Sequence, residues 1–225
     1  VEGDKLHVPE WRTDIHYMAD VAEEVARIYG YDNIPVTMFK GATAQGGYTD
    51  EQKKRNLTGS VCRGMGYSEI LTYSFGSPAM FDQIRMAKDN PLRNAIRILN
   101  PLGEDTSIMR TTTLPCMMET LSRNNAYRNK AAKLYEINKI YVPVDGEDLP
   151  REDMILTLGT YGASETFFTM KGEIETILKA LNAQKSAYTA VKDNPSYHPG
   201  RCARLTVGDT VIGVFGQVHP QVAAN

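Results

Sequence analysis

The sequence predicts an α+β fold in which a mainly antiparallel sheet is flanked by helices. Segments with helical periodicity separate segments rich in strand-forming residues, and two strand-like segments late in the chain are joined by a two-residue turn. Hydrophobic residues make up 42% and charged residues 23% of the 225 residues, close to the averages of globular domains. These observations favour a folded domain of moderate size rather than a disordered chain.

The clearest helix is expected over residues 14–29, where apolar residues recur at three- and four-residue steps. Thr13 or Asp14 is expected to cap its start, and Gly30 to end it in a left-handed conformation. Residues 5–9 read as a short strand that ends at a proline. A stretch rich in Gly and Thr after the helix predicts a linker, which places a domain boundary near residue 40.

The rest of the chain is expected to alternate between helices and strands. The expected helices cover residues 50–65, 113–128 and 167–181, and the expected strands cover 70–75, 95–99, 133–142, 155–161, 204–207 and 211–215. Asp50 is the expected cap of the first of these helices. The last two strands are expected to pair across the Gly208–Asp209 turn.

Charge and hydropathy exclude several classes of protein. Lys and Arg number 25 against 27 Asp and Glu, which gives a net charge of -2. A chain that grips nucleic acid by neutralising phosphates is usually far more basic. Apolar runs fall short of the roughly 18 residues needed to span a bilayer, so a soluble protein is expected. The three cysteines are widely separated and form no zinc-ribbon pair, which favours a reducing cytosol.

One acidic group suggests a metal site. Asp20, Glu23 and Glu24 have helical spacing that places their carboxylates on one face, and Asp14 precedes the same helix. Oxygen ligands of this kind suit a hard cation such as Mg²⁺. The alternative is a solvated helix face, because acids near a helix N-terminus are favoured by the dipole and Glu23 has Arg27 four residues on.

Other catalytic signatures are missing from the sequence. The four histidines never occur at metal-ligand spacing, and His198 and His219 each precede a proline in a turn-like context. The chain has no nucleophile-elbow motif, no P-loop and no dinucleotide-binding glycine motif. The residues and their spacing therefore predict no self-contained active site.

Several longer strings resemble one family. Trp-Arg-Thr-Asp-Ile at 11–15 and Glu-Glu-Val-Ala-Arg-Ile-Tyr-Gly-Tyr-Asp-Asn-Ile-Pro at 23–35 resemble the β subunit of bacterial phenylalanine–tRNA ligase. Further matching strings lie at 66–75, 100–103, 109–115, 134–137, 171–172, 198–201 and 214–220. The resemblance covers nearly the whole chain apart from the linker. The first residue is not Met and the last follows a strand-like segment, so a piece of a longer chain is expected.

The resemblance implies a fold, a reaction and partners. Residues 1–40 would be the C-terminal part of a small winged-helix-like domain plus a linker, and residues 41–225 a core similar to the catalytic fold of class II synthetases. The family enzyme is a cytoplasmic α2β2 tetramer that joins L-phenylalanine to tRNA(Phe), with ATP bound by the α subunit. The β core would be a non-catalytic support. Glu136 is expected where an ATP-binding arginine would stand, and a carboxylate there would repel a phosphate.

The resemblance also implies two sets of site residues. Asp14, Asp20, Glu23 and Glu24 match the family's Mg²⁺ ligands, at a site shared with the α subunit. The helix at 50–65 would pair with the partner subunit, and the candidate anchors on it are Leu57, Val61, Cys62 and Met65. A stand-alone Mg²⁺-binding or nucleic-acid-binding module is kept as the alternative. No membrane partner is expected.

Overall fold

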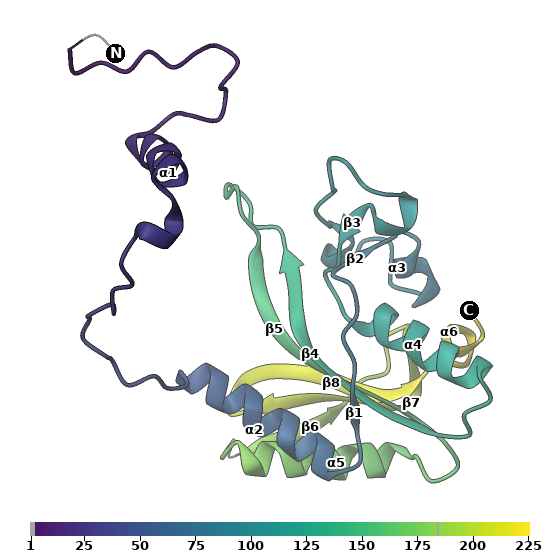
Figure 1. Ribbon diagram of the computed structural model, residues 1–225. Helices are drawn as coiled ribbons and strands as arrows, with labels where there is room; N and C mark the ends of the chain where they lie inside the picture. Colours follow the sequence, from purple (N-terminus) through teal and green to yellow (C-terminus); the bar gives the residue numbers. More distant parts are fainter. Residues whose placement is uncertain (1–2, 184) are drawn as a thin grey trace. The chain divides into compact units, whose positions relative to one another are not determined.

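The computed structural model describes residues 3–183 and 185–225 of the chain (Figure 1). It divides into two units, Val1–Gly47 and Tyr48–Asn225, so the division falls a few residues after the boundary expected near residue 40. The second unit contains the sheets and most of the helices.

The first unit is built around helix α1, Met18–Tyr29, followed by the short 3-10 turn η1, Tyr31–Asn33. The helix begins later than the predicted residue 14, because a carboxylate further along the chain fixes its start. Asp20 accepts hydrogen bonds from the backbone N–H groups of His16 and Tyr17, both at 2.8 Å. Gly30 ends the helix at φ +94°, as its position predicted.

Two expectations for the start of the chain were wrong. Tyr17 is the N-cap residue of α1, so neither Thr13 nor Asp14 caps it. Residues 5–9 form no continuous strand, and only Lys5 has bridge geometry. A strand needs a neighbour to receive its backbone hydrogen bonds, and the described part of this unit has no other strand to provide them.

The second unit holds its strands in three sheets within the described residues. The first sheet has the order β1-β4-β5, the second β2-β3 and the third β6-β7-β8. The β1–β4 pair is parallel and the other pairs are antiparallel, as the predicted fold class requires. The strands are β1 Ser68–Glu69, β2 Phe75–Gly76, β3 Ile108–Met109, β4 Ala132–Val142, β5 Arg151–Tyr161, β6 Ser186–Ala190, β7 Tyr197–Val207 and β8 Thr210–Val218.

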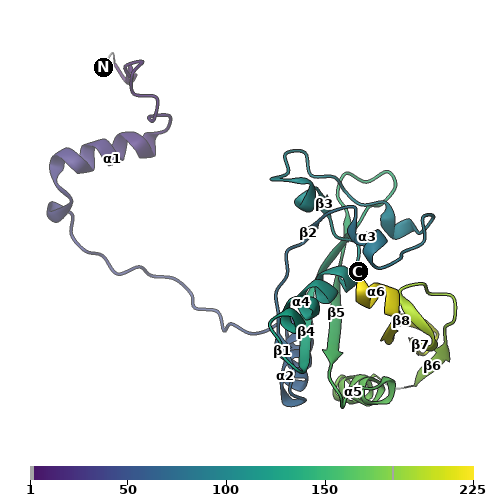
Figure 2. The same ribbon diagram turned by 90° about the vertical axis from the view of Figure 1, so that its right-hand side faces the viewer.

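Helices lie beside these sheets (Figure 2). Among the described residues the buried apolar side chains form separate cores. They are α2 Asp50–Gly64, α3 Met80–Gln83, α4 Leu114–Ala126, α5 Phe167–Ala180 and α6 Pro220–Ala224. One core joins Cys62 of α2 to Tyr135 of β4 and Ile177 of α5. Another joins α3 to α6, where Val222 packs with Met80 and Phe81. The first core thus ties the N-terminal helix of the unit to β4 and α5, and the second ties its C-terminal helix to α3.

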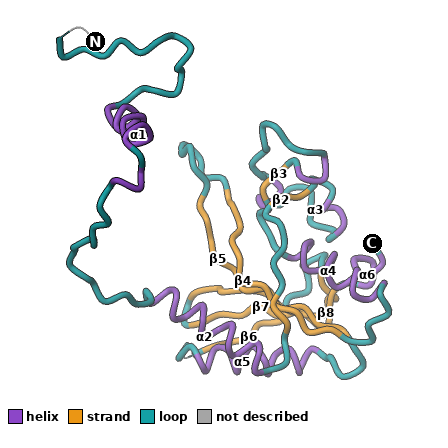
Figure 3. The backbone as a smooth tube through the Cα atoms, in the orientation of Figure 1, coloured by secondary structure: helices purple, strands orange, loops and turns teal. Residues whose placement is uncertain are grey.

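Two predicted strands are largely absent, and Figure 3 shows the first of them as the loop between β1 and β2. Residues 70–74 form no strand, because the backbone N–H of Thr72 binds the Glu136 carboxylate instead of continuing the ladder. Residues 95–99 contribute a single bridge, between Arg97 and Ile108. Both segments are rich in strand formers, but local propensity does not decide how far a ladder extends, because that depends on the neighbouring segments.

The C-terminal hairpin confirms the turn at Gly208–Asp209, with β7 and β8 paired on either side of it. The pairing shifts register between Tyr197 and Cys202, so β7 carries a bulge there. Gly216 lies opposite this bulge. A Cβ atom at Gly216 would stand 2.3 Å from the Arg201 carbonyl oxygen, whereas one at Gly213 would meet nothing within 4 Å.

We therefore expect Gly216→Ala to destabilise the chain by about 1–3 kcal/mol, because the clash is with backbone that must move. Gly213→Ala, in the same strand, is the matched control and should change stability by less than about 0.5 kcal/mol. Urea denaturation of both variants measures the difference. If the two variants were equally stable, a side chain at position 216 would be tolerated opposite the bulge, and the expected clash with the Arg201 carbonyl would be wrong.

Candidate functional site

The centre of the second unit contains a buried ion pair between Arg110 and Glu136, and both residues are 0% exposed. Arg110 follows β3, a few residues before α4, and Glu136 lies in the middle of β4. Their closest charged atoms, Arg110 Nη1 and Glu136 Oε2, are 3.5 Å apart. A charge removed from water this completely requires a partner and further hydrogen bonds.

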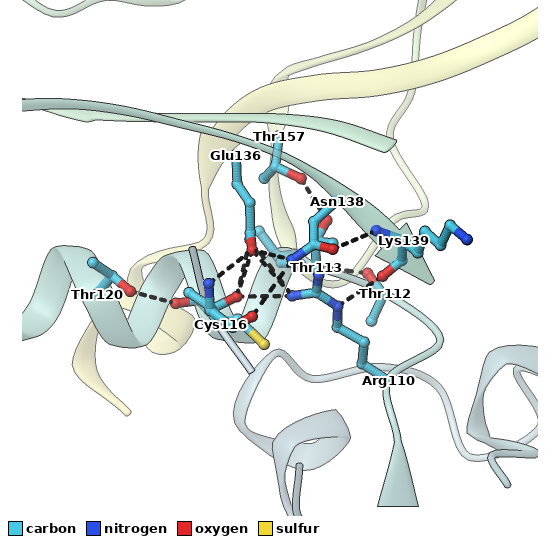
Figure 4. Close-up of polar contacts among 11 residues, drawn as sticks. Arg110, Thr112, Thr113, Cys116, Thr120, Glu136, Asn138, Lys139 and Thr157 are labelled. Carbon is cyan, nitrogen blue, oxygen red and sulfur yellow. Dashed lines mark hydrogen bonds and ion pairs between the residues drawn. The ribbon is translucent and has the colours of Figure 1, made fainter. Parts of the chain in front are cut away.

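Neighbouring polar groups supply those hydrogen bonds (Figure 4). Glu136 accepts from the Thr72 backbone N–H, the Thr72 hydroxyl and Asn138 Nδ2, each at 2.9 Å. Arg110 donates to Thr72 Oγ1 at 2.7 Å and to the Lys139 carbonyl oxygen at 2.9 Å. The Thr72 hydroxyl thus lies between the guanidinium and the carboxylate, accepting from the first and donating to the second. We call Thr72, Arg110, Glu136 and Asn138 the buried polar cluster.

This arrangement corrects the role expected for Glu136. The side chain faces no open site where a phosphate could approach, because the buried polar cluster surrounds it. Its negative charge is compensated by Arg110 within the chain. The cluster links three chain segments through hydrogen bonds and one ion pair. Only Arg110 Nη2 is buried without a hydrogen-bond partner among the described residues of the cluster.

The sequence-based prediction includes Glu136 but not Thr72, Arg110 or Asn138, the other members of the cluster. One feature of the sequence did point to such a cluster. Glu136 is a charged residue within the strand-forming stretch 134–137, and a charge in a buried strand predicts a buried partner. The identity of that partner depends on which segments the fold brings to β4.

Removing one member of the ion pair should be more damaging than removing both. Arg110→Met leaves the Glu136 charge buried and unpaired, and we expect a loss of about 3–5 kcal/mol in unfolding free energy. The double variant Arg110→Met with Glu136→Gln should lose less, because no charge remains to be desolvated. Urea denaturation of both variants measures this.

The control for that comparison is Arg123→Met, at an exposed ion pair with Glu119, which should change stability by less than about 0.5 kcal/mol. Additive losses in the double variant would contradict the view that the two charges act as one unit.

The acidic group of the first unit is held by arginines. Arg12 Nη2 lies 2.7 Å from Asp14 Oδ2 and 2.8 Å from Glu24 Oε1, so one guanidinium joins the two carboxylates. Arg27 Nη2 binds the other oxygen of Glu24 at 2.7 Å. The structure therefore brings Asp14 and Glu24 together, with a cation of the chain between them.

Asp20 and Glu23 do not join this pair. The Asp20 carboxylate is occupied at the start of α1 by two backbone N–H groups, and Glu23 is exposed. Within residues 3–183 and 185–225, no group of three or more acidic, histidine or cysteine side chains is placed to hold a metal ion. In this arrangement Arg12 binds Asp14 and Glu24, the start of α1 binds Asp20, and the exposed Glu23 lies apart from them, so the four predicted ligands do not converge on one point.

The hydrogen bonds from Arg12 lower the pKa of Asp14 from 3.8 to about 2. Hydrogen bonds from Arg12, and next from Arg27, lower the pKa of Glu24 from 4.5 to about 2. A carboxyl whose pKa is depressed in the folded state stabilises that state above its unfolded pKa. This contribution is lost as the pH falls from the ordinary values towards about 2.

We expect Arg12→Gln to raise both pKa values, Asp14 towards 3.8 and Glu24 by a smaller amount because Arg27 stays in place. Titration of the side-chain carboxyl carbons by NMR measures both. Arg123→Gln, at the ion pair with Glu119 in the other unit, should leave the two values unchanged. Unshifted values in Arg12→Gln would mean that Arg12 does not hold these acids in solution.

The predicted interface residues on α2 differ in their exposure. Leu57 is 43% exposed, while Val61 and Met65 are half-buried against the core formed with β4 and α5. Cys62 is 0% exposed within that core and is therefore unavailable as an anchor for a partner, which corrects its choice from the sequence. Leu57, Val61 and Met65 stay predictions.

The fold is that of the class II aminoacyl-tRNA synthetases. Two solved structures of pyrrolysyl-tRNA synthetase from Desulfitobacterium hafniense are similar, with TM-scores of 0.58 and 0.57 at 12% sequence identity. The similarity covers 87% of this chain and 63% of the first of those chains, and 88% and 62% for the second. At this identity the likeness establishes the fold alone.

Sequence comparison identifies the family. Residues 34–225 match the family described as "Phenylalanyl tRNA synthetase beta chain CLM domain", and residues 2–31 match "tRNA synthetase B5 domain". The chain belongs to the phenylalanyl-tRNA synthetase β chain family. The phenylalanine–tRNA ligase β subunit of Clostridium acetobutylicum is 43% identical over all of this chain and 29% of its own length. That of Clostridium tetani is 45% identical, with the same coverage.

The chain therefore spans less than a third of the length of these curated relatives. Among the described residues, every helix falls short of the length and apolar character that a membrane span requires.

Proposed function

We propose that this chain acts as a non-catalytic core of the β subunit of phenylalanine–tRNA ligase, the enzyme that joins L-phenylalanine to tRNA(Phe) with ATP. The observation that carries the proposal is the buried polar cluster. Its Arg110 and Glu136 fill the middle of a synthetase-like sheet and bind each other, so this part of the fold stabilises the chain instead of binding a nucleotide. The enzyme works in the cytoplasm.

The proposal assigns the chemistry to a partner. An α subunit would contain the active site and bind ATP, and two copies of each subunit would form an α2β2 tetramer that binds tRNA(Phe). Leu57, Val61 and Met65 of α2 would contribute to the surface that the α subunit covers. Support comes from Leu57, an apolar side chain left 43% exposed on a helix whose neighbouring residues are otherwise mostly polar.

The test is to mix the purified chain with purified α subunit and to measure complex formation by size-exclusion chromatography. We expect Leu57→Lys to weaken the complex, because a charge would then be buried against the partner. Asn56→Lys places the same charge at the adjacent exposed position of α2 and is the matched control. Equal complex formation by both variants would place the interface elsewhere.

The same preparations test the absence of catalysis. The chain without its partner should show no ATP–pyrophosphate exchange above a no-protein control, because Glu136 and Arg110 are sealed from solvent. Exchange by the chain alone would overturn the non-catalytic assignment, whatever the outcome of the assembly experiment.

A magnesium role for Asp14, Asp20, Glu23 and Glu24 remains part of the proposal for the assembled enzyme only. In this chain Arg12 occupies the place between Asp14 and Glu24, so a cation shared with the α subunit would require Arg12 to release them. The Mg²⁺ ion would then supply the positive charge that Arg12 supplies here.

Changing Glu23 and Glu24 together to Gln in the full enzyme tests this role. We expect the tetramer of the variant to lose the stabilisation that Mg²⁺ gives the unmodified enzyme, because two anionic ligands are removed. Thermal unfolding across a Mg²⁺ titration measures it, and Glu119→Gln in the other unit is the control. An unchanged Mg²⁺ dependence would identify the acids as a solvated helix face.

A further inference from the structure

Two histidines lie together where β7 and β8 meet α6. Tyr197 of β7 pairs with Val218 of β8, and the next residues along the two strands are His198 and His219. His198 stands at the start of the register shift in β7, and His219 is the residue between β8 and α6. The two histidines therefore follow paired residues at the open end of the hairpin.

Arg85 approaches the same place from the loop after α3. Its Nη1 donates to the Pro195 carbonyl oxygen at 3.4 Å, just before β7. Ser196 joins the three segments, since its hydroxyl donates to the Ile84 carbonyl oxygen at 2.6 Å and its own carbonyl oxygen accepts from the His219 backbone N–H at 2.9 Å. The fold thus holds Arg85 beside the two histidines.

The charges around this group are positive. Partial burial, and then the nearby Arg85 and His198, lower the pKa of His219. The two groups that act on His219 through their charge are therefore both basic. All three residues are partly buried but keep some exposed surface, so a ligand from solvent has access to them.

Backbone contacts fix the orientation of both imidazole rings. His198 Nδ1 accepts from the Gly200 N–H at 3.1 Å, and His219 Nδ1 accepts from the Gln221 N–H at 3.2 Å. A neutral imidazole that accepts at Nδ1 carries its proton on Nε2, so each ring offers an N–H donor at that atom. A guanidinium also donates without accepting. Arg85, His198 and His219 therefore all offer N–H hydrogen-bond donors. Such a set suits a ligand whose oxygen atoms accept hydrogen bonds.

We propose that Arg85, His198 and His219 form a binding site for a phosphate oxyanion. The fixed Nε2–H groups and the free guanidinium N–H groups of Arg85 would bind the phosphoryl oxygens, and the positive charge of Arg85 would strengthen these hydrogen bonds. The phosphate would belong either to a free phosphate compound or to the backbone of an RNA. This site lies outside the buried polar cluster and the acidic group, and it does not depend on the proposed ligase role.

Histidine NMR tests the site in the complete 225-residue chain, which has only four histidines to resolve. At pH 8, where inorganic phosphate is mainly a dianion, phosphate is titrated against sodium chloride of matched ionic strength. We expect a saturable shift of the His198 and His219 ring resonances with phosphate alone. His16, in the other unit, should not move and serves as the internal control.

The variants His198→Asn and His219→Asn remove the Nε2–H donors but keep a side-chain oxygen able to accept from the backbone N–H two residues on. Each variant, and likewise Arg85→Gln, should weaken phosphate binding at least about tenfold, the effect of losing a hydrogen bond to a charged group. His16→Asn should leave the affinity unchanged. Unchanged affinity in all three site variants would overturn the proposal.

A second titration, with a single-stranded RNA octanucleotide, separates the two sources of phosphate. Saturable shifts with both probes, lost in the Arg85→Gln variant, would assign the site to a nucleic-acid backbone. Shifts with inorganic phosphate alone would assign it to a free phosphate compound. No saturable shift with either probe would show that the three side chains simply face water, and the proposal would be wrong.

Discussion

The buried charge of Glu136 is the constraint on which the rest of the second unit depends. A carboxylate at 0% exposure in the middle of β4 requires both a counter-charge and hydrogen-bond donors around it. Arg110 and Thr72 provide them from two other segments, one before α4 and one between β1 and β2. The chain must therefore pass close to β4 at two further points, and this fixes the path of both segments.

In the first unit, charges of the same sign are held together by an arginine at the surface. Asp14 and Glu24 would repel each other if they were left close together, and Arg12 joins them with two short contacts. The result is an acidic pair that carries its own counter-ion. An internal arginine keeps such a pair stable when no other cation is present.

Local sequence pattern located the long elements well and the short ones poorly. Helices α2, α4 and α5 begin and end close to the expected residues, because each has a long periodic stretch and a distinct end. The expected strand at 70–75 is interrupted because the Thr72 N–H binds the Glu136 side chain. The expected strand at 95–99 is reduced to a single bridge between Arg97 and Ile108. The cap of α2 is Thr49, one residue before the expected Asp50, since its hydroxyl accepts from the Gln52 N–H.

The sequence by itself determined the fold class, the C-terminal hairpin and the family, because periodicity, turn residues and long matching strings are all local properties of the chain. Only the tertiary structure decided the partners of the charged residues. The pairing of Glu136 with Arg110 joins residues that are far apart in the chain. Arg85 likewise lies near His198 and His219, which come much later in the chain. Asp20 binds backbone N–H groups at the start of α1, and neither it nor Glu23 joins the other acids. Such pairings follow from the path of the backbone, since a buried or crowded charge binds whichever neighbour the fold brings within reach.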